Sequence, residues 1–141
     1  MNNIKSIKEA SQLVCMSLKN RLGYPNEVRP INEGRYIYVR YREEHILILY
    51  KREHFLTFNR HDEGGHGDTI NTKELDFALE NNVKRIFVVY PNRSIYVISP
   101  YTIKVLGVRR INEAESKDVM SFDMKHLIRF TMYPEAKEMI Q

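Results

Sequence analysis

The chain has 141 residues, of which 43% are hydrophobic and 28% charged; 22 Lys and Arg outnumber 18 Asp and Glu, giving a net charge of +4. These values exclude a disordered chain and suit one domain. No apolar run reaches the about 18–20 residues that a membrane-spanning helix needs. The single cysteine, Cys15, excludes an intrachain disulfide. We therefore expect one cytoplasmic domain over 1–141 in a reducing compartment, without a signal peptide or membrane partner, whose tail 131–141 is helical or frayed.

The first predicted element is a helix over 6–22. Ser6 and Glu9 have the spacing of a capping box, which satisfies backbone N–H groups at a helix start. Apolar residues then recur at helical spacing as far as Leu22. Gly23 ends the helix, because glycine tolerates the positive φ of a C-terminal cap.

Three strands are predicted next, after a loop between Pro25 and Pro30. Residues 35–42 alternate between an apolar and a polar face, residues 45–51 are apolar on both faces, and residues 54–58 form a third short run. Connections this short join neighbouring strands only in an antiparallel meander.

Glycine, proline and capping residues divide the rest of the chain into short elements. The next ones are a Gly-rich loop over 61–68, a helix from the capping box Asn71–Glu74 to 81–82, a buried strand Ile86–Tyr90, and a hairpin through Pro91–Ser94 to a strand Ile95–Ile98. The last ones are a short helix between Ser99 and Gly107, a charged loop over 108–118, a short strand near 119–122, and a final turn or helix through Phe130.

This order predicts an α/β (α+β) fold, with helix, three-strand antiparallel meander, helix, buried strand and hairpin in one mixed sheet flanked by helices. Over Ile4–Ile98 the order resembles the core of the restriction-endonuclease-like (PD-(D/E)XK) nucleases. The resemblance implies metal-dependent phosphodiester cleavage, in which acids hold Mg²⁺ and a lysine activates the attacking water. Charged residues at the strand ends and at the exit of the first helix are the candidates for these catalytic roles: Glu27, Lys51, Glu53 and His54.

A polar face of the first predicted strand carries two tyrosines and two arginines, namely Tyr36, Tyr38, Arg40 and Arg42. Tyrosine rings stack on bases and guanidinium groups pair with phosphates, so this face is a candidate nucleic-acid surface. The alternative is the ordinary solvent face of an antiparallel strand. Further candidates for phosphate contacts are Arg52, Arg60, Arg109 and Arg110.

The loop over 61–68 contains five side chains able to ligate a metal ion, among them His61, His66 and Asp68. Imidazole and carboxylate groups suit Zn²⁺ or Mn²⁺. Glu53 completes the candidate metal ligands, and Mg²⁺ or Mn²⁺ is the expected cofactor of a nuclease. The alternative is a polar glycine loop that binds no metal.

Together these features predict a protein that binds DNA or RNA on a nuclease-like scaffold, and that either only binds or also cuts DNA with a metal ion. A symmetric dimer would suit cleavage of both strands. The alternative function is a non-enzymatic protein that self-associates through exposed tyrosines and the apolar edge of the hairpin at Ile95. The binding hypothesis requires the arginines and tyrosines to converge into one cationic groove.

Overall fold

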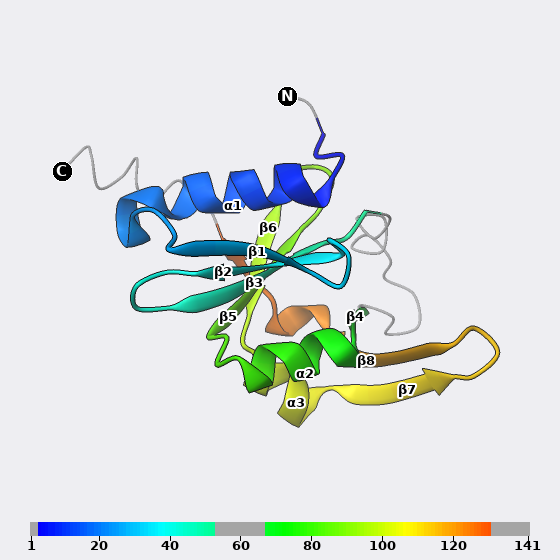
Figure 1. Ribbon diagram of the computed structural model, residues 1–141. Helices are drawn as coiled ribbons and strands as arrows, with labels where there is room; N and C mark the ends of the chain where they lie inside the picture. Colours follow the sequence, from blue (N-terminus) through cyan, green and yellow to red (C-terminus); the bar gives the residue numbers. More distant parts are fainter. Residues whose placement is uncertain (1–2, 53–66, 131–141) are drawn as a thin grey trace.

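The computed structural model describes residues 3–52 and 67–130, which form two β-sheets and three α-helices (Figure 1). The elements are α1 (Ile7–Leu22), β1 (Glu27–Ile31), β2 (Tyr36–Arg40), β3 (His45–Tyr50), β4 (Gly67–Asn71), α2 (Thr72–Glu80), β5 (Arg85–Val89), β6 (Ile95–Ile98), α3 (Pro100–Leu106), β7 (Val108–Asn112), β8 (Lys117–Asp123), the 3-10 turn η3 (Met124–His126) and β9 (Ile128–Phe130). In these ranges no helix combines the length and the apolar character that crossing a membrane requires.

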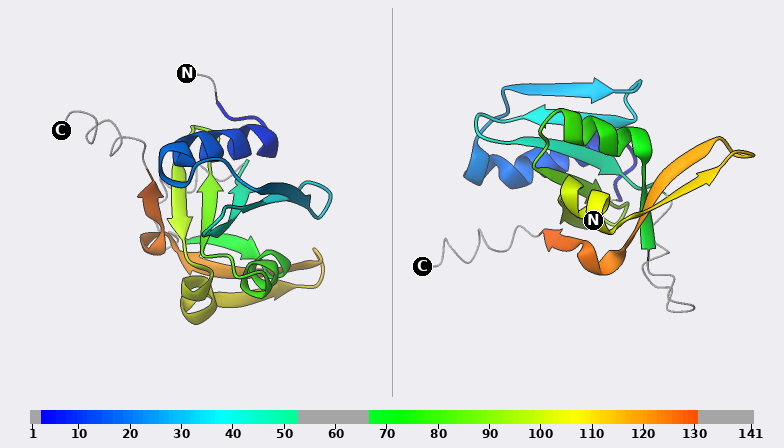
Figure 2. Two further views of the ribbon diagram at one scale, coloured as in Figure 1. Left: turned by 60° about the vertical axis from the view of Figure 1, so that its left-hand side comes forward. Right: turned by 90° about the horizontal axis from the view of Figure 1, so that it is seen from below.

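Six strands make the larger sheet, sheet A, in the order β1-β2-β3-β5-β6-β9. Its central pair, β3 and β5, is parallel, with Ile46 beside Arg85, and the other pairs are antiparallel. The helix α1 lies across one face, while α2, α3 and the smaller sheet lie on the other (Figures 1 and 2). The predicted mixed sheet with flanking helices is confirmed.

The helix α1 forms where the capping and apolar spacing predict it. The Ser6 hydroxyl accepts a hydrogen bond from the Glu9 amide at 3.1 Å, and Gly23 follows the helix with φ +73°. Its buried stripe of Ala10, Val14 and Leu18 packs on the inward residues of β2 and β3. One face of sheet A is thereby sealed.

The opposite face of β2 is also buried, and the predicted exposed tyrosine face is wrong. Tyr36 and Tyr38 are each 4% exposed, because α2 covers them. The Phe77 ring of α2 meets both tyrosine rings edge-on, with centroids 5.7 Å apart. Neither tyrosine therefore offers a ring face on which a base could stack.

The meander exists, but it begins one strand earlier than the sequence predicts. The predicted loop between Pro25 and Pro30 contains β1, and the predicted strand over 54–58 lies outside the described residues. Pro30 misleads the sequence pattern, since proline is excluded from central strands yet tolerated on edge strands. The strand β1 is such an edge.

Three more strands build sheet B, in the order β4-β8-β7, and the predicted strand near 119–122 is confirmed as part of β8. The end of the predicted Gly-rich loop is β4, and the predicted charged loop over 108–118 is β7 with the start of β8. The β7–β8 hairpin projects beyond the rest of the molecule (Figures 1 and 2).

The end of the described chain also differs from the prediction. Instead of a turn or helix through Phe130, the chain makes η3 and then the strand β9. Because β9 pairs with β6, the hairpin at Ile95 has no free edge, and the predicted route of self-association through that edge is wrong.

The helix α3 joins β7 through Gly107, as its capping residues predict. Gly107 has φ −77°, which any residue adopts, so its requirement is space rather than backbone freedom. A Cβ there would clash with the Ile103 carbonyl oxygen and lie 3.1 Å from Met120 Cε. Sheet B thus packs directly against the last turn of α3.

We expect Gly107→Ala to lower the free energy of unfolding by about 1–3 kcal/mol, the usual cost of overpacking, measured by urea denaturation. Gly34→Ala is the matched control, because its Cβ would meet nothing within 4 Å while its φ of +82° is strained. The Gly34→Ala control should lower the free energy of unfolding by about 1–2 kcal/mol through backbone strain alone. A Gly107→Ala protein as stable as the parent would contradict the close packing of α3 on β8.

Candidate functional site

A pocket of about 430 Å³ lies where the end of β3 meets sheet B. Its charged lining residues are Arg35, Lys51, Arg52 and Lys117, with Glu74 as the one acid among the described lining residues. Four positive charges thus face one carboxylate. Such an arrangement attracts anions rather than cations.

A second hollow of about 430 Å³ adjoins the first at the start of α1. Lys5 and Ser6 contribute to it, and the two hollows share Arg35, Tyr50 and Arg52. We call both hollows the cationic groove, whose residues are Lys5, Arg35, Tyr50, Lys51, Arg52 and Lys117. The groove passes around the end of β3.

Strand alternation sends neighbouring residues of β3 into different hollows. Ile48 and Tyr50 belong to the α1 side of sheet A, where the Tyr50 hydroxyl donates to the Ile4 carbonyl at 2.6 Å. Lys51 is next in the chain and therefore points to the sheet B side. Arg35 enters from the β1–β2 turn, where Gly34 and its two predecessors have positive φ.

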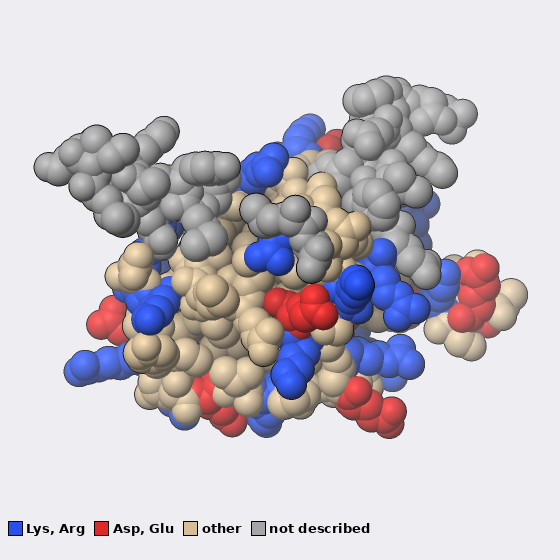
Figure 3. Space-filling model, turned by 90° about the horizontal axis from the view of Figure 1, so that it is seen from above, with Lys and Arg blue, Asp and Glu red and all other residues tan. Residues whose placement is uncertain are grey.

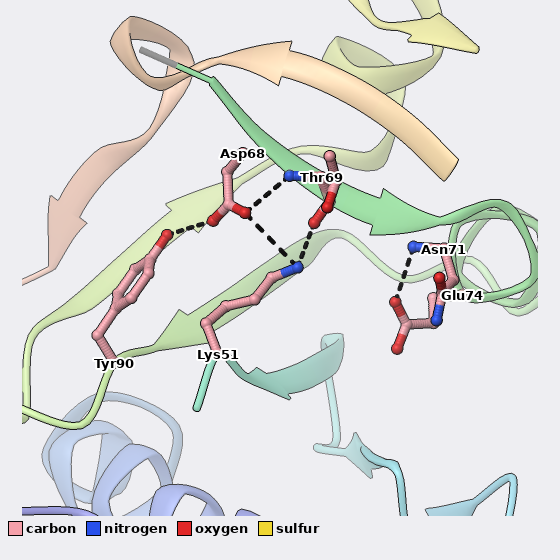
Figure 4. Close-up of polar contacts among 6 residues, drawn as sticks. All are labelled: Lys51, Asp68, Thr69, Asn71, Glu74 and Tyr90. Atoms are coloured by element: carbon pink, nitrogen blue, oxygen red, sulfur yellow. Dashed lines mark hydrogen bonds and ion pairs between the residues drawn. The ribbon is translucent and has the colours of Figure 1, made fainter. Parts of the chain in front are cut away.

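The ammonium of Lys51 connects the two sheets (Figure 4). It donates to the Thr69 carbonyl of β4 and lies 3.7 Å from an Asp68 carboxylate oxygen. Asp68 also accepts hydrogen bonds from its neighbour's amide at 2.7 Å and from the Tyr90 hydroxyl of the β5–β6 turn. The side chains of Lys51 and Asp68 are 13% and 1% exposed, so this ion pair is buried.

Glu74 lies in the first turn of α2, on the wall of the groove. Its carboxylate accepts the Asn71 amide at 3.0 Å, which confirms the predicted capping box. Burial raises the pKa of the Glu74 carboxyl, while Lys51 and Arg35 oppose that rise. Glu74 is partly buried. An anion that binds beside this carboxylate would raise its pKa further, because like charges favour the protonated form.

The exposed arginines of the groove form no ion pairs with described residues. Neither Arg35 nor Arg52 forms an ion pair with a carboxylate in 3–52 or 67–130, whereas Lys117 lies 3.4 Å from Glu115. Viewed from above α1, Lys and Arg side chains crowd the right-hand part of the molecule, where α1 begins (Figure 3). The charges of Arg35 and Arg52 are therefore available to a ligand.

Other predicted site residues lie elsewhere. Glu27 pairs with Arg29 and Arg40, at 3.5 and 3.4 Å. The register places Glu27 and Arg40 beside His45, at the start of β3, whereas Lys51 follows its end. With about 3.3 Å per strand residue, roughly 20 Å separates the two ends, so the structure does not bring Glu27 to Lys51. Arg42 is exposed in the turn before β3.

The two arginines predicted on the charged loop have different surroundings. Arg109 makes a bidentate pair with Asp118, at 3.0 and 2.6 Å, and together with the Thr72 hydroxyl it lowers the pKa of Asp118 to about 2. Arg110 stands opposite Val119, which lines the first pocket, so both project from the same face of the hairpin. Arg110 therefore lies on the groove side and Arg109 does not.

The predicted convergence of arginines is only partly correct. Arg52 lines the groove, but Arg40 and Arg109 are dispersed and paired with carboxylates. Glu53, His54, Arg60, His61 and His66 lie outside the described residues. No group of three metal-ligating side chains occurs in the described parts of the chain, and both Asp68 oxygens already accept hydrogen bonds.

Arg35, Glu74 and Lys117 are groove residues that the sequence analysis did not select. Arg35 has a local signal, since it directly follows Gly34 and precedes a strand. Lys117 and Glu74 have no such signal in the local sequence, because only the pairing of β4 with β8 brings them to the groove. No family model, curated protein or solved structure matches this chain.

We expect Asp68→Asn to lower the free energy of unfolding by about 3–5 kcal/mol, because it leaves the Lys51 ammonium buried without its counter-charge. Urea denaturation at pH 7 measures the loss, and Asp76→Asn, on the exposed side of α2, is the control. Lys51→Met with Asp68→Asn should be more stable than Asp68→Asn alone, since no buried charge remains. Strictly additive losses would show that the two groups do not interact.

Proposed function

We propose that this protein binds nucleic acid through the cationic groove. The observation that carries the proposal is the clustering of Arg35, Arg52, Lys51 and Lys117 on one concave surface, with both arginines unpaired among described residues. Nucleic acids are polyanions, and protein cations that replace their counterions supply most of non-specific affinity.

The groove suits a chain of phosphates better than a single anion. Its two hollows share a wall and extend from Lys5 to Lys117, so successive phosphates can contact separate cations. Arg110 extends the same face along the hairpin. Recognition of this kind depends on charge and spacing, and it requires no base-specific contact.

Arg52→Ala tests the groove directly. Fluorescence anisotropy with a labelled oligonucleotide over a salt series should show weaker binding and a log K against log salt slope smaller by about 0.7–0.9, the value of one phosphate contact. Arg42→Ala is the matched control, because Arg42 is exposed at the opposite end of β3. If both variants lose affinity equally, binding runs along the meander as the sequence predicts; if neither does, the groove is not the binding surface.

Glu74 makes the proposed binding depend on pH. Its carboxyl has a raised pKa, and protonation removes a negative charge from the anion site, so affinity should rise as the pH is lowered from 7 towards that pKa. Glu74→Gln keeps an acceptor for the Asn71 amide and should bind roughly fivefold tighter at pH 7, about 1 kcal/mol for one charge near water. Glu80→Gln, at the exposed end of α2, should not. An unchanged pH profile in Glu74→Gln would exclude this group as the cause.

Metal-dependent cleavage of the bound strand is a second candidate function. It is favoured by the position of Lys51 and Asp68, 3.7 Å apart beside the groove, because an acid and a lysine are the residue types that the endonuclease resemblance implies. A metal ion there would have to replace hydrogen bonds that the Asp68 carboxylate accepts. The test is the nicking of supercoiled plasmid with Mg²⁺, Mn²⁺ or chelator. Cleavage is supported if the plasmid is nicked only with metal, and if Lys51→Met loses this activity while Lys104→Met keeps it. If the protein binds the plasmid without nicking it, its function is binding alone.

A further inference from the structure

We propose that the cationic groove is a site for single-stranded nucleic acid, and that duplex is a poor ligand. This inference rests on the proposed function and names its substrate class. It is carried by the position of the two hollows on either side of the end of β3, and by Tyr50, which lines both.

The path between the hollows turns around the end of β3, where neighbouring side chains lie on opposite faces of sheet A. Tyr50 packs on the α1 side of sheet A, whereas Lys51 reaches Thr69 and Asp68 on the other side. A polyanion that occupies both hollows must therefore turn over Arg35 and Arg52, the charged residues that the hollows share. Duplex DNA is stiff over about 150 base pairs, whereas a single strand turns freely at each nucleotide.

The size of each hollow also favours a single strand as the ligand. A volume of about 430 Å³ lies at the small end of the about 300–1,000 Å³ typical of small-molecule pockets. Each hollow thus has room for about one nucleotide unit, the unit that a single strand presents to a surface. Lys51, at 13% exposure, is reachable only by a group that enters the first hollow.

Tyr50 gives this path an aromatic wall. Its hydroxyl is bound to the Ile4 carbonyl at 2.6 Å, which fixes the ring between α1 and the groove. Tyr36 and Tyr38 are buried under α2 and cannot take this role. A fixed ring beside cations is the combination that holds single strands without sequence preference, through stacking and phosphate contacts.

The test compares the affinities of three ligands at one salt concentration. They are a labelled twelve-nucleotide oligothymidylate, a labelled blunt-ended duplex of the same length, and, as a competitor, inorganic polyphosphate with the same charge as the oligothymidylate. We expect the single strand to bind at least tenfold tighter than the duplex and tighter than polyphosphate. Equal or tighter duplex binding overturns this inference and leaves the proposed function standing. Failure of all three to bind overturns the proposed function itself.

Tyr50→Leu isolates the aromatic wall. It should weaken binding of the oligothymidylate at least fivefold while leaving polyphosphate affinity unchanged, because only bases stack. Tyr50→Phe, which retains the ring, should bind the oligothymidylate more tightly than Tyr50→Leu. Tyr101→Leu, on the exposed side of α3, is the control for tyrosine removal. If Tyr50→Leu loses the same affinity for the oligothymidylate and for polyphosphate, the ring only shapes the groove and does not stack on bases. If Tyr50→Leu does not fold, the comparison of single strand with duplex in the wild-type protein still decides strand preference.

Discussion

A buried ammonium group at the end of β3 joins the two sheets. The Lys51 side chain leaves sheet A and is satisfied by the Thr69 carbonyl and the Asp68 carboxylate of β4. A charge removed from water is tolerated only where partners of this kind surround it. Tyr90, from the β5–β6 turn, adds a third element to the same carboxylate. The first hollow lies beside this contact, between the end of β3 and the strands β4 and β8.

Arginines of similar sequence context end in different electrostatic surroundings. Arg40 and Arg109 each form an ion pair with a carboxylate on the neighbouring strand, so their charge is neutralised within the protein. Arg35 and Arg52 emerge from a turn and a strand end, and neither forms an ion pair with a carboxylate of the described chain. The surface charge that matters for a partner is therefore local, and the net charge of +4 conceals it.

Elements with local signals were predictable, and those that depend on distant pairing were not. Capping residues and apolar spacing located α1, α2 and α3, and the apolar run of β3 indicated a strand covered on both faces. The strand β1 was missed because of Pro30, and β4 because its pairing with β8 joins segments about fifty residues apart. For the site, Lys51 and Arg52 were recognisable as charged residues beyond a buried strand. Glu74 and Lys117 were not, since only the docking of sheet B brings them there.

The walls of the groove come from both ends of the described chain, from Lys5 to Lys117. Such a surface has high contact order, and loop closure must precede any of its contacts. A chain emerging from the ribosome would carry Arg35, Tyr50 and Arg52 long before β8 supplies the opposite wall. The first hollow would then be completed only when synthesis has passed β8, whereas every residue that lines the second hollow lies between Lys5 and Arg52.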